Sequence, residues 1–473
     1  MPVGLVRQQE AVVNMKQPMI VRLSAAVLLL ASLSLWMARN TGVHEVHREN
    51  DPENFPVPDA RPEPGDWPWW RGTTQCNVLP FENPPSVWSP GSANGWMMPS
   101  QGRGRTGLCL WGGQIFLPTL DPARESFSLL SLDHATGRVL WQREVHREGV
   151  KSANPRMPQC SSTPACDGQH VFSVCSVHGS LWVTAVDLNG HIAWQQEVGP
   201  YFSKWGYNSS PVIHKSLVIV AADNKGARIN RFVGASYLAA LHRQTGEIVW
   251  RIHRPEADSF GTPVVAKVAG REQLLIAGHG QICSYNPSTG EELWKCRWSA
   301  DRVSNSVAFD EEHVYASSRQ PRQELICIKA NGSGDVTKTH IVWQSNKSAS
   351  DNSSPVINEG RLYTVTDDGV LSCLEAGTGQ AIWKRRLTGS FSSSPIIAGQ
   401  HLYCCNEDGV ITVIRLGGRG EIVAEIDLGE GILASPVISL NRLFIRTLSN
   451  VHCIKPDEAG PIAIEPNSIK RNL

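Results

Sequence analysis

A glycine followed four residues later by a tryptophan recurs along this chain, and no other feature restricts its fold as strongly. The pair occurs at 137 and 141, 190 and 194, 246 and 250, 290 and 294, and 379 and 383. Around the last pair, in residues 353–383, four short apolar runs are separated by the turn sequences NEG, DDG and AGTG. This arrangement predicts a four-stranded antiparallel sheet. One such sheet cannot bury both of its faces, so we expect its copies to stack against one another.

A second marker, a proline that opens the first strand of each sheet, allows the copies to be counted. It occurs at 164, 211, 263, 355, 395 and 436, with Val307 in the same position of a degenerate copy. It follows the tryptophan position by 12 residues at 343–355, 383–395 and 424–436. Trp96 lies 12 residues before Leu108, which opens another apolar run. The sheet that Trp96 would end therefore has its first three strands elsewhere.

Three strands without a fourth lie at the other end of the chain. Residues 436–439, 443–446 and 451–454 predict them, and no tryptophan-bearing strand follows. We therefore predict an all-β fold, an eight-bladed β-propeller of four-stranded antiparallel blades. A strand near Trp96 completes the C-terminal blade and closes the ring, which removes exposed sheet edges at its ends. The alternative, an open solenoid, would leave both fragments incomplete.

The repeated tryptophans have a structural interpretation. The turn at each glycine needs a positive φ, and the indole on the returning outer strand can lie between adjacent sheets, burying about 150–250 Å². This docking role is expected for Trp96, Trp141, Trp194, Trp250, Trp294, Trp343 and Trp383. Counting back from the glycines, small residues and Cys373 share one register, so most of the 12 cysteines are expected to be small apolar fillers. Cys160 and Cys166 could form a local disulfide.

The first 40 residues predict export. Arg7, Lys16 and Arg22 precede the uncharged apolar run 23–37, which is short for a membrane span of about 20 residues and typical of a secretory signal. A signal peptide and an uncleaved membrane anchor both stay open for residues 1–40. The charged, proline-rich residues 41–66 predict an extended linker, followed by the propeller at 67–455 and a C-terminal tail at 456–473. We expect a periplasmic or cell-envelope location.

Composition and motifs exclude several classes of function. Lys plus Arg and Asp plus Glu both number 44, so the net charge favours neither nucleic acid nor a membrane surface as a partner. The motifs HExxH, GxxxxGK[ST] and GxSxG are absent from the sequence. We therefore predict no catalytic residue and no metal ligand from motifs.

The unit x-Asp-x-x-Thr-Gly-x-x-x-Trp, present as LDHATGRVLW and less regularly as LHRQTGEIVW and YNPSTGEELW, resembles the repeat of the pyrroloquinoline quinone (PQQ) family of eight-bladed β-propellers. The resemblance covers about residues 67–455. With WPWWRG at 67–72 and the export signal, the chain looks most like PQQ-like repeat proteins of planctomycete-type bacteria. The family implies one of two roles. Quinoprotein dehydrogenases hold PQQ and calcium on the ring axis, whereas binding propellers such as BamB, the outer-membrane assembly lipoprotein, hold no cofactor.

The dehydrogenase branch of that family carries a vicinal cysteine pair against the quinone, an aspartate base and a set of calcium ligands. Cys404 and Cys405 match the pair superficially, but they lie in HLYCCNEDG, where other copies have their second strand. No acidic set can be matched residue by residue. We therefore expect no cofactor and a non-catalytic binding or scaffold protein of the cell envelope. The alternative is a quinoprotein oxidoreductase that uses PQQ and calcium.

Long loops at 146–162, 199–210 and 223–236 are expected on one face of the ring. Links from an outer strand to the next inner strand emerge on the same face as links from a second strand to a third strand. Binding usually resides in such loops. We expect a monomer that binds an envelope protein, an acidic peptide, a glycan or an anionic ligand there, with Trp205 and Tyr207 as anchors. The alternative is that these aromatic side chains only hold the loops in place. The candidate residues are Arg156, Tyr201, Lys204, Trp205, Tyr207, Asn208, Asn224, Lys225, Arg228 and Arg231, with Arg103 and Arg105 at the same rim.

Overall fold

The structure, a computed structural model, describes residues 45–46, 57, 59–89, 95–100, 106–121, 123–150, 161–203, 205–224, 236–256, 258–278 and 280–456. The chain divides into two compact units, residues 1–44 and 45–473, and every described residue belongs to the second. The predicted signal peptide or anchor therefore lies outside the described residues. Within these ranges there is no helix of the length and apolarity needed to cross a membrane.

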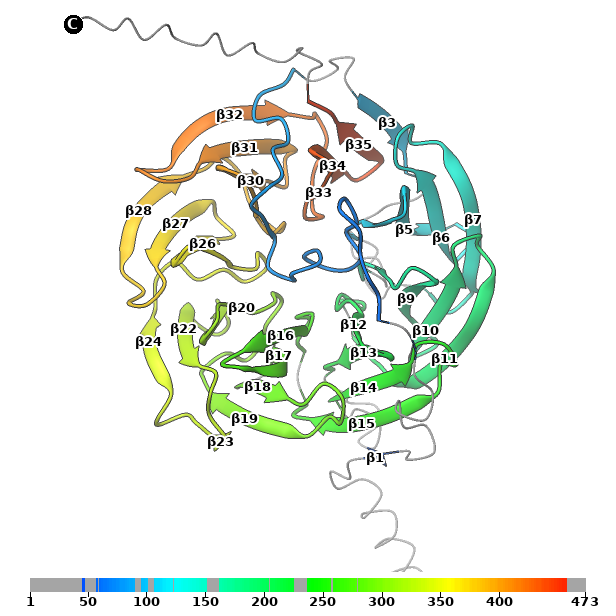
Figure 1. The fold of residues 1–473 in the computed structure, drawn as a ribbon, viewed down its shortest axis with the longest axis horizontal. Coiled ribbons are helices and arrows are strands. Elements are labelled where there is room, and N and C mark those ends of the chain that lie inside the picture. Colours follow the sequence, from blue (N-terminus) through cyan, green and yellow to red (C-terminus); the bar gives the residue numbers. More distant parts are fainter. Residues whose placement is uncertain are drawn as a thin grey trace, which may run out of the picture. The chain divides into compact units, whose positions relative to one another are not determined.

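Eight antiparallel blades form a ring around one axis (Figure 1). The first four run from the inner to the outer strand as follows. Blade 1 is β4 (Cys109–Trp111), β5 (Gln114–Asp121), β6 (Ser126–Asp133) and β7 (Val139–Arg147). Blade 2 is β8 (Ala165–Cys166), β9 (His170–Val177), β10 (Ser180–Asp187) and β11 (Ile192–Pro200). Blade 3 is β12 (Val212–His214), β13 (Leu217–Ala222), β14 (Ser236–His242) and β15 (Ile248–Arg254). Blade 4 is β16 (Val264–Val268), β17 (Arg271–Gly278), β18 (Gln281–Tyr285) and β19 (Glu292–Arg297).

The second half of the ring repeats this order. Blade 5 is β20 (Ala308–Phe309), β21 (His313–Ser318), β22 (Glu324–Lys329) and β24 (Ile341–Ser345). Blade 6 is β25 (Val356–Asn358), β26 (Arg361–Val365), β27 (Val370–Glu375) and β28 (Ala381–Arg386). Blade 7 is β29 (Ile396–Ala398), β30 (His401–Cys405), β31 (Val410–Arg415) and β32 (Glu421–Asp427). Blade 8 is β33 (Val437–Ser439), β34 (Arg442–Arg446), β35 (Asn450–Ile454) and β3 (Gly95–Pro99).

Blade 8 contains both ends of the ring. Its outer strand β3 pairs antiparallel with β35, so that Trp96 lies opposite Cys453 and Met98 opposite Val451. This pairing joins a segment that precedes blade 1 in sequence to the last three strands of the chain. The predicted ring closure and the eight-bladed, all-β fold are therefore confirmed.

Three short strands are added to this plan. β1 (Glu45–Val46) pairs with the outer strand of blade 3, β23 (Gly334–Asp335) lies parallel to the outer strand of blade 4, and β2 (Val78–Leu79) lies parallel to the inner strand of blade 7. The residues expected to form a linker thus contribute an edge strand, because the unpaired edge of β15 offers backbone hydrogen bonds to an extended segment.

Each repeated indole packs on a glycine turn of the following blade. A Cβ atom on Gly137 would lie 2.5 Å from Trp96, and one on Gly190 would lie 2.9 Å from Trp141. The same contact joins Trp194 to Gly246, Trp250 to Gly290, Trp343 to Gly379 and Trp383 to Gly420. In four cases the indole Nε1 also donates to a backbone carbonyl of that blade, at His134, Leu188, Arg243 and Ala376. The tryptophans therefore lock neighbouring blades together.

Trp294 is the exception to this contact. The blade that follows it has an insertion in place of the short glycine turn, and Trp294 Nε1 donates instead to Gln273 Oε1 of its own blade over 2.7 Å. The inserted strand β23 pairs with Trp294 and Lys295. The indole is nevertheless fully buried, at 0% exposure.

A small residue lies directly opposite the tryptophan position within the same blade. The pairs include Ser131 with Trp141, Ala185 with Trp194, and Cys373 with Trp383. A β-bulge follows the small residue in each of these blades, which re-aims the outer strand. Of the 11 cysteines that the structure describes, all are free thiols and only Cys76 is not buried. The partner expected for Cys166, Cys160, lies outside the described residues.

The hydrophobic core consists of clusters between neighbouring blades. Phe116 and Leu129 of blade 1, for example, pack with Val171 and Cys175 of blade 2. A buried ion pair also joins blades 2 and 3: Arg243 Nη1 of blade 3 lies 2.6 Å from Asp167 Oδ2 of blade 2. Each blade therefore depends on both of its neighbours, as expected of stacked repeats.

Candidate functional site: a pocket on the ring axis

A belt of hydroxyl groups surrounds the axis where the inner strands begin. At six blade junctions, a backbone N–H donates to the side-chain hydroxyl at the equivalent position of the next blade over 2.8–3.1 Å. The residue just before the marker position of each inner strand is therefore also a link between blades. In order around the ring, the belt positions are Gly107, Thr163, Ser210, Thr262, Ser306, Ser354, Ser394 and Ser435.

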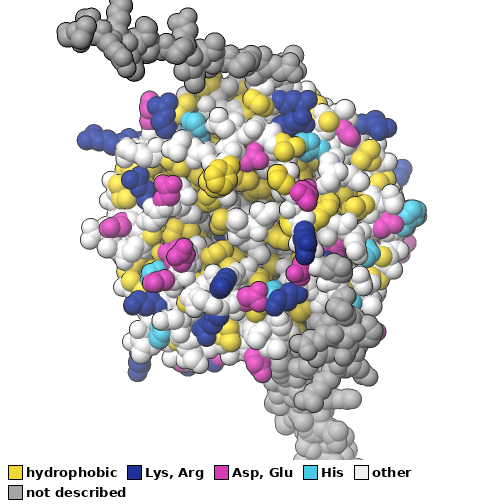
Figure 2. All heavy atoms as spheres, in the orientation of Figure 1, with side chains coloured by type: hydrophobic (Ala, Val, Ile, Leu, Met, Phe, Trp, Pro, Cys, Tyr) yellow, Lys and Arg dark blue, Asp and Glu magenta, His cyan; other side chains and the backbone are white. Residues whose placement is uncertain are grey.

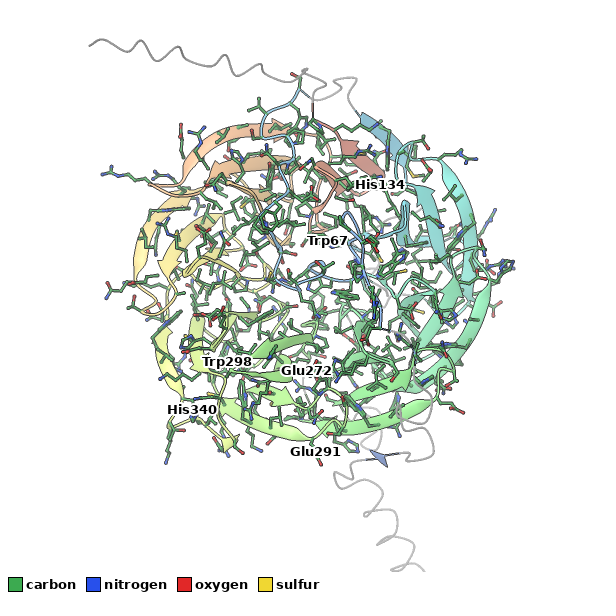
Figure 3. All side chains as sticks on the ribbon, in the orientation of Figure 1. Trp67, His134, Glu272, Glu291, Trp298 and His340 are labelled. Carbon is green, nitrogen blue, oxygen red and sulfur yellow. The ribbon has the colours of Figure 1, made fainter. Side chains whose placement is uncertain are left out.

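Residues 67–77 close one end of the axis. Figure 1 shows this segment, in blue, passing across the middle of the ring, and Figure 3 labels Trp67 near the centre. Polar side chains and backbone groups tie the segment to six blades, because each inner strand leaves carbonyl or N–H groups free at its start. The hydrogen bonds join Trp67 with Leu110, Pro68 with Cys166, Gln75 with Val265, Arg71 with Val307 and Pro355, and Asn77 with Pro395.

The face crossed by this segment has a mixed surface. Figure 2 shows hydrophobic side chains gathered near its middle and charged side chains of both signs scattered over it. No large field of a single sign is visible there, consistent with a net charge of +0. This face therefore offers no electrostatic signature of a strongly charged partner.

A cavity of about 340 Å³ lies on the axis above the floor formed by Trp70. All eight belt positions line it, which places it at the centre of the ring. Its other polar and aromatic lining comes from links between an outer strand and the next inner strand, and these links emerge on the face that carries the long loops. The side chains concerned are Trp205, Asn208, Phe260, Arg302, Asp351 and Asn352, together with the serines at 161, 304 and 392.

An ion pair dominates the electrostatics of this axial pocket. Arg302 Nη2 donates to Asp351 Oδ2, and the two side chains are 31% and 12% exposed. Burial, opposed by the Arg302 charge, raises the pKa of the Asp351 carboxyl. The lining that the structure describes carries no other charged side chain, so the pocket is close to neutral.

Two polar atoms of this ion pair have no hydrogen-bond partner among the described residues. They are Arg302 Nε and Asp351 Oδ1, both buried. A buried polar atom left unsatisfied costs about 1–3 kcal/mol, and such atoms are rare enough in native proteins to require an explanation. A ligand or ordered water that reached this ion pair would satisfy both atoms.

The structure divides the predicted binding residues into three groups. Trp205 and Asn208 line the axial pocket. Tyr201, Tyr207 and Asn224 are 2%, 1% and 0% exposed, which corrects the expectation that they present surface to a partner. The remaining candidates, Arg156, Lys204, Lys225, Arg228, Arg231, Arg103 and Arg105, lie outside the described residues.

The two tyrosines are buried because each completes the core under its loop. Tyr201 and Tyr207 form an edge-to-face pair with ring centroids 5.2 Å apart. The Tyr201 hydroxyl donates to the Gly206 carbonyl over 3.1 Å, and the Tyr207 hydroxyl donates to the Ala221 carbonyl over 3.0 Å. Among the aromatic candidates predicted in this loop, Trp205 is the one that lines the axial pocket.

Arg302, Asp351 and Trp70 line the pocket but were not predicted from the sequence as binding residues. A usable signal was present: Arg302 and Asp351 lie four and three residues before the belt positions Ser306 and Ser354. Residues so close to the start of an inner strand must lie near the axis of a propeller. Trp70 gives no comparable signal, because its partner Ser306 is distant in sequence.

The residues present do not fit a calcium-bound quinone. Calcium takes about six to eight oxygen ligands, usually with several carboxylates, whereas Asp351 is the only carboxylate in the described lining and is paired with Arg302. No group of three or more His, Cys, Asp or Glu side chains in the described ranges could hold a metal ion. Cys404 and Cys405 belong to two different core clusters on opposite faces of blade 7 and do not line the pocket.

Comparison with known proteins places the chain among related propellers. A family model, PQQ_2, described as outer membrane protein assembly factor BamB, matches residues 125–352 and 335–423, which together span more than half of the 473 residues. The chain belongs to the PQQ_2 family. Both roles implied by the sequence resemblance are represented among its relatives.

One curated relative is an enzyme subunit. Subunit 1 of methanol dehydrogenase (cytochrome c) from Methylobacterium organophilum is 23% identical over 171 residues, which cover 32% of this chain. The chain spans about a quarter of that relative, 27% of its length. About three quarters of the enzyme subunit therefore have no counterpart in the match.

Solved structures show the same fold. BamB from Moraxella catarrhalis matches 77% of this chain and 99% of its own, with 15% identity and a TM-score of 0.54. The quinohemoprotein alcohol dehydrogenase from Comamonas testosteroni matches 83% of this chain and 81% of its own, with 12% identity and a TM-score of 0.60. At these identities the likeness concerns the fold, and the choice between the two roles depends on the site.

Proposed function

We propose that this chain is an exported, non-catalytic binding or scaffold propeller of the bacterial cell envelope. It docks a protein, a peptide or a glycan on the face that carries the long loops, with the axial pocket at the centre of that face. The description of the matching family as a BamB assembly factor supports an envelope role with a protein partner.

One observation carries the choice of a binding protein over an enzyme. The axial pocket, where a propeller of this fold would hold a redox cofactor, has a single carboxylate in its described lining, and Arg302 neutralises it. General acid–base chemistry needs a group within reach that can accept or release a proton. Asp351 is instead held as an ion-pair partner.

Photo-crosslinking in the native envelope tests the docking face. A photoreactive residue at Trp205 is expected to capture a discrete partner, whereas the same residue at Gln400, an exposed position in the turn between β29 and β30, is not. Trp205→Ala is expected to weaken that partner's binding by about tenfold while the unfolding midpoint changes little. Equal capture at both positions would show that the loop-bearing face is the wrong one.

The second candidate function, a quinoprotein oxidoreductase, is favoured by the match to methanol dehydrogenase. Calorimetric titration of the full chain with PQQ and calcium decides between the two. We expect no saturable heat and no quinone absorbance in the protein as isolated. Stoichiometric, calcium-dependent PQQ binding together with dye reduction would overturn the proposed function.

A further inference from the structure

We propose that the axial pocket binds a neutral carbohydrate, the terminal one or two rings of a glycan. This inference rests on the proposed function and names the ligand class of its central site. It is argued from the charge, the aromatic surface and the hydrogen-bonding capacity of the described lining.

The charge of the pocket disfavours both anionic and cationic ligands. The described lining holds one cation, Arg302, and one anion, Asp351, and the two neutralise each other. An anionic ligand would have to compete with Asp351 for the guanidinium, and a cationic ligand would have to displace Arg302 from the carboxylate. A ligand without charge meets neither cost.

Aromatic surface is available on two sides. Trp70 Nε1 donates to Ser306 Oγ over 3.1 Å, so the polar edge of this indole is already hydrogen-bonded to the pocket wall. We infer that a ligand would contact the ring of Trp70. Trp205 and Phe260 add further aromatic lining from other links. The C–H groups on one side of a pyranose ring form an apolar, slightly positive surface, which packs well on the negative face of an indole.

The polar lining suits hydroxyl groups. A hydroxyl can donate and accept at once, so a sugar can serve both Arg302 Nε, a donor, and Asp351 Oδ1, an acceptor, which have no partner among the described residues. Small side-chain rotations would bring these buried atoms to a ligand. Six of the belt hydroxyls accept a backbone N–H, and Ser306 Oγ accepts the Trp70 indole N–H. Each of these hydroxyls has an O–H donor of its own. Asn208 and Asn352 supply amide groups with both capacities.

The size of the pocket limits the ligand. A cavity of about 340 Å³ is at the lower end of the ~300–1,000 Å³ range of small-molecule sites. It therefore accepts the end of a glycan and leaves the rest of a longer chain on the loop-bearing face. The closed floor at Trp70 prevents a polymer from threading through the ring.

Binding to defined sugars tests this inference. The full chain is titrated calorimetrically with maltose, cellobiose and N,N′-diacetylchitobiose as neutral probes, and with glucuronic acid and inorganic phosphate as anionic probes. We expect one neutral disaccharide to bind at a single site with millimolar or tighter affinity, and neither anion to bind. Failure of all three neutral probes, or preferential binding of an anion, would overturn the inference.

Variants locate the site. Asp351→Asn and Trp205→Ala are each expected to weaken sugar binding by about tenfold. Asp335→Asn, which alters an exposed Arg–Asp pair at the rim of blade 4, is the matched control and is expected to leave binding unchanged. Ser304→Trp fills the pocket from a half-buried lining position without removing a charged group, and it is expected to abolish binding. Sugar binding that survives in Ser304→Trp would place the site elsewhere.

The two proposals fail in different ways. PQQ and calcium binding would overturn the proposed function. A discrete crosslinked partner at Trp205 combined with no sugar binding would overturn only the carbohydrate inference. Comparison of a free disaccharide with the corresponding polysaccharide distinguishes a soluble ligand from the end of an envelope glycan.

Discussion

Gly379 and Gly377 lie two residues apart in one turn, but only Gly379 faces an indole. Gly379 has a φ of 70°, and a Cβ atom there would lie 2.7 Å from Trp343, whereas Gly377 has open space around it. We expect Gly379→Ala to lower the free energy of unfolding by about 1–3 kcal/mol and Gly377→Ala to change it by less than about 0.5 kcal/mol. Urea unfolding measures both, and equal effects would contradict the docking of Trp343 on this turn.

His134 makes the seam between blades 8 and 1 sensitive to acid. Its Nε2 lies 3.2 Å from Ser439 Oγ and its Nδ1 lies 3.2 Å from Arg442 Nη1. Burial, followed by the charge of Arg442, lowers the pKa of His134 from 6.5 to about 4. Between about pH 6.5 and pH 4, His134 is therefore protonated in the unfolded chain but neutral in the folded protein. The stability contributed by neutral His134 is lost as the pH falls through this range.

Unfolding of the wild type and of His134→Asn at pH 7 and pH 4.5 isolates this contribution. Each tenfold difference in proton affinity is worth about 1.4 kcal/mol, so the wild type is expected to lose about 1–3 kcal/mol more than the variant. Other buried histidines contribute equally to both proteins. His191→Asn, at an exposed position, serves as the control, and an unchanged pH dependence in His134→Asn would rule out the role given to His134.

The structural role of a residue can be predicted from the sequence only where equivalent residues make the same contact in every copy of the repeat. The indoles follow one spacing, so their place opposite a small residue in the same blade could be inferred from alignment of the copies. Tyr207 and Trp205 look alike in sequence, yet Tyr207 is 1% exposed and Trp205 lines the pocket. The path of a loop decides which of them is buried, and no repeat constrains that path.

At the scale of elements, the axial segment 67–77 shows how much a propeller can depend on residues outside its blades. Arg71 is 1% exposed and donates to the carbonyls of Val307 and Pro355, which belong to blades 5 and 6. Burial lowers the pKa of Arg71 to about 10. The side chain satisfies two carbonyls at once because the guanidinium presents several N–H groups in a fixed plane.

Arg71→Lys tests this bridging role. A lysine ammonium cannot reach both carbonyls in the same planar arrangement, so we expect the free energy of unfolding to fall by about 1–3 kcal/mol. Arg61→Lys, at an exposed position of the preceding segment, is expected to have no measurable effect. Equal stability of the two variants in urea would mean that the segment lies on the axis without bracing the blades.

The sequence indicates that WPWWRG is ordered but not where it lies. Aromatic density predicts packing, whereas the partners of the segment, from Leu110 to Pro395, are spread through nearly the whole ring. The axial pocket is hidden for the same reason, since its lining is collected from all blades. Only the period of the repeat, which places each strand start near the axis, links these positions before the structure is known.

At the scale of the whole molecule, closure of the ring through β3 and β35 is the feature on which folding depends. A chain that lacks residues 1–44 keeps both partners of this pairing, whereas a chain that lacks residues 1–100 loses β3 and exposes the edge of β35. We expect the longer chain to be monomeric with a single cooperative transition and the shorter one to self-associate, because a free edge pairs with other chains. Gel filtration and thermal unfolding of both chains test this prediction. A shorter chain that is monomeric and has an unchanged unfolding midpoint would contradict the role given to ring closure.

Ring closure also makes completeness of synthesis a condition of stability. The strand Gly95–Pro99 is translated before every blade, but its partner Asn450–Ile454 is among the last residues described. Until translation reaches that point, the nascent protein has an unpaired strand edge at each end of the incomplete ring, and the closed ring cannot form. A prematurely terminated product is therefore marked as defective by its own architecture, and proteases can distinguish it from the full-length protein without any dedicated signal.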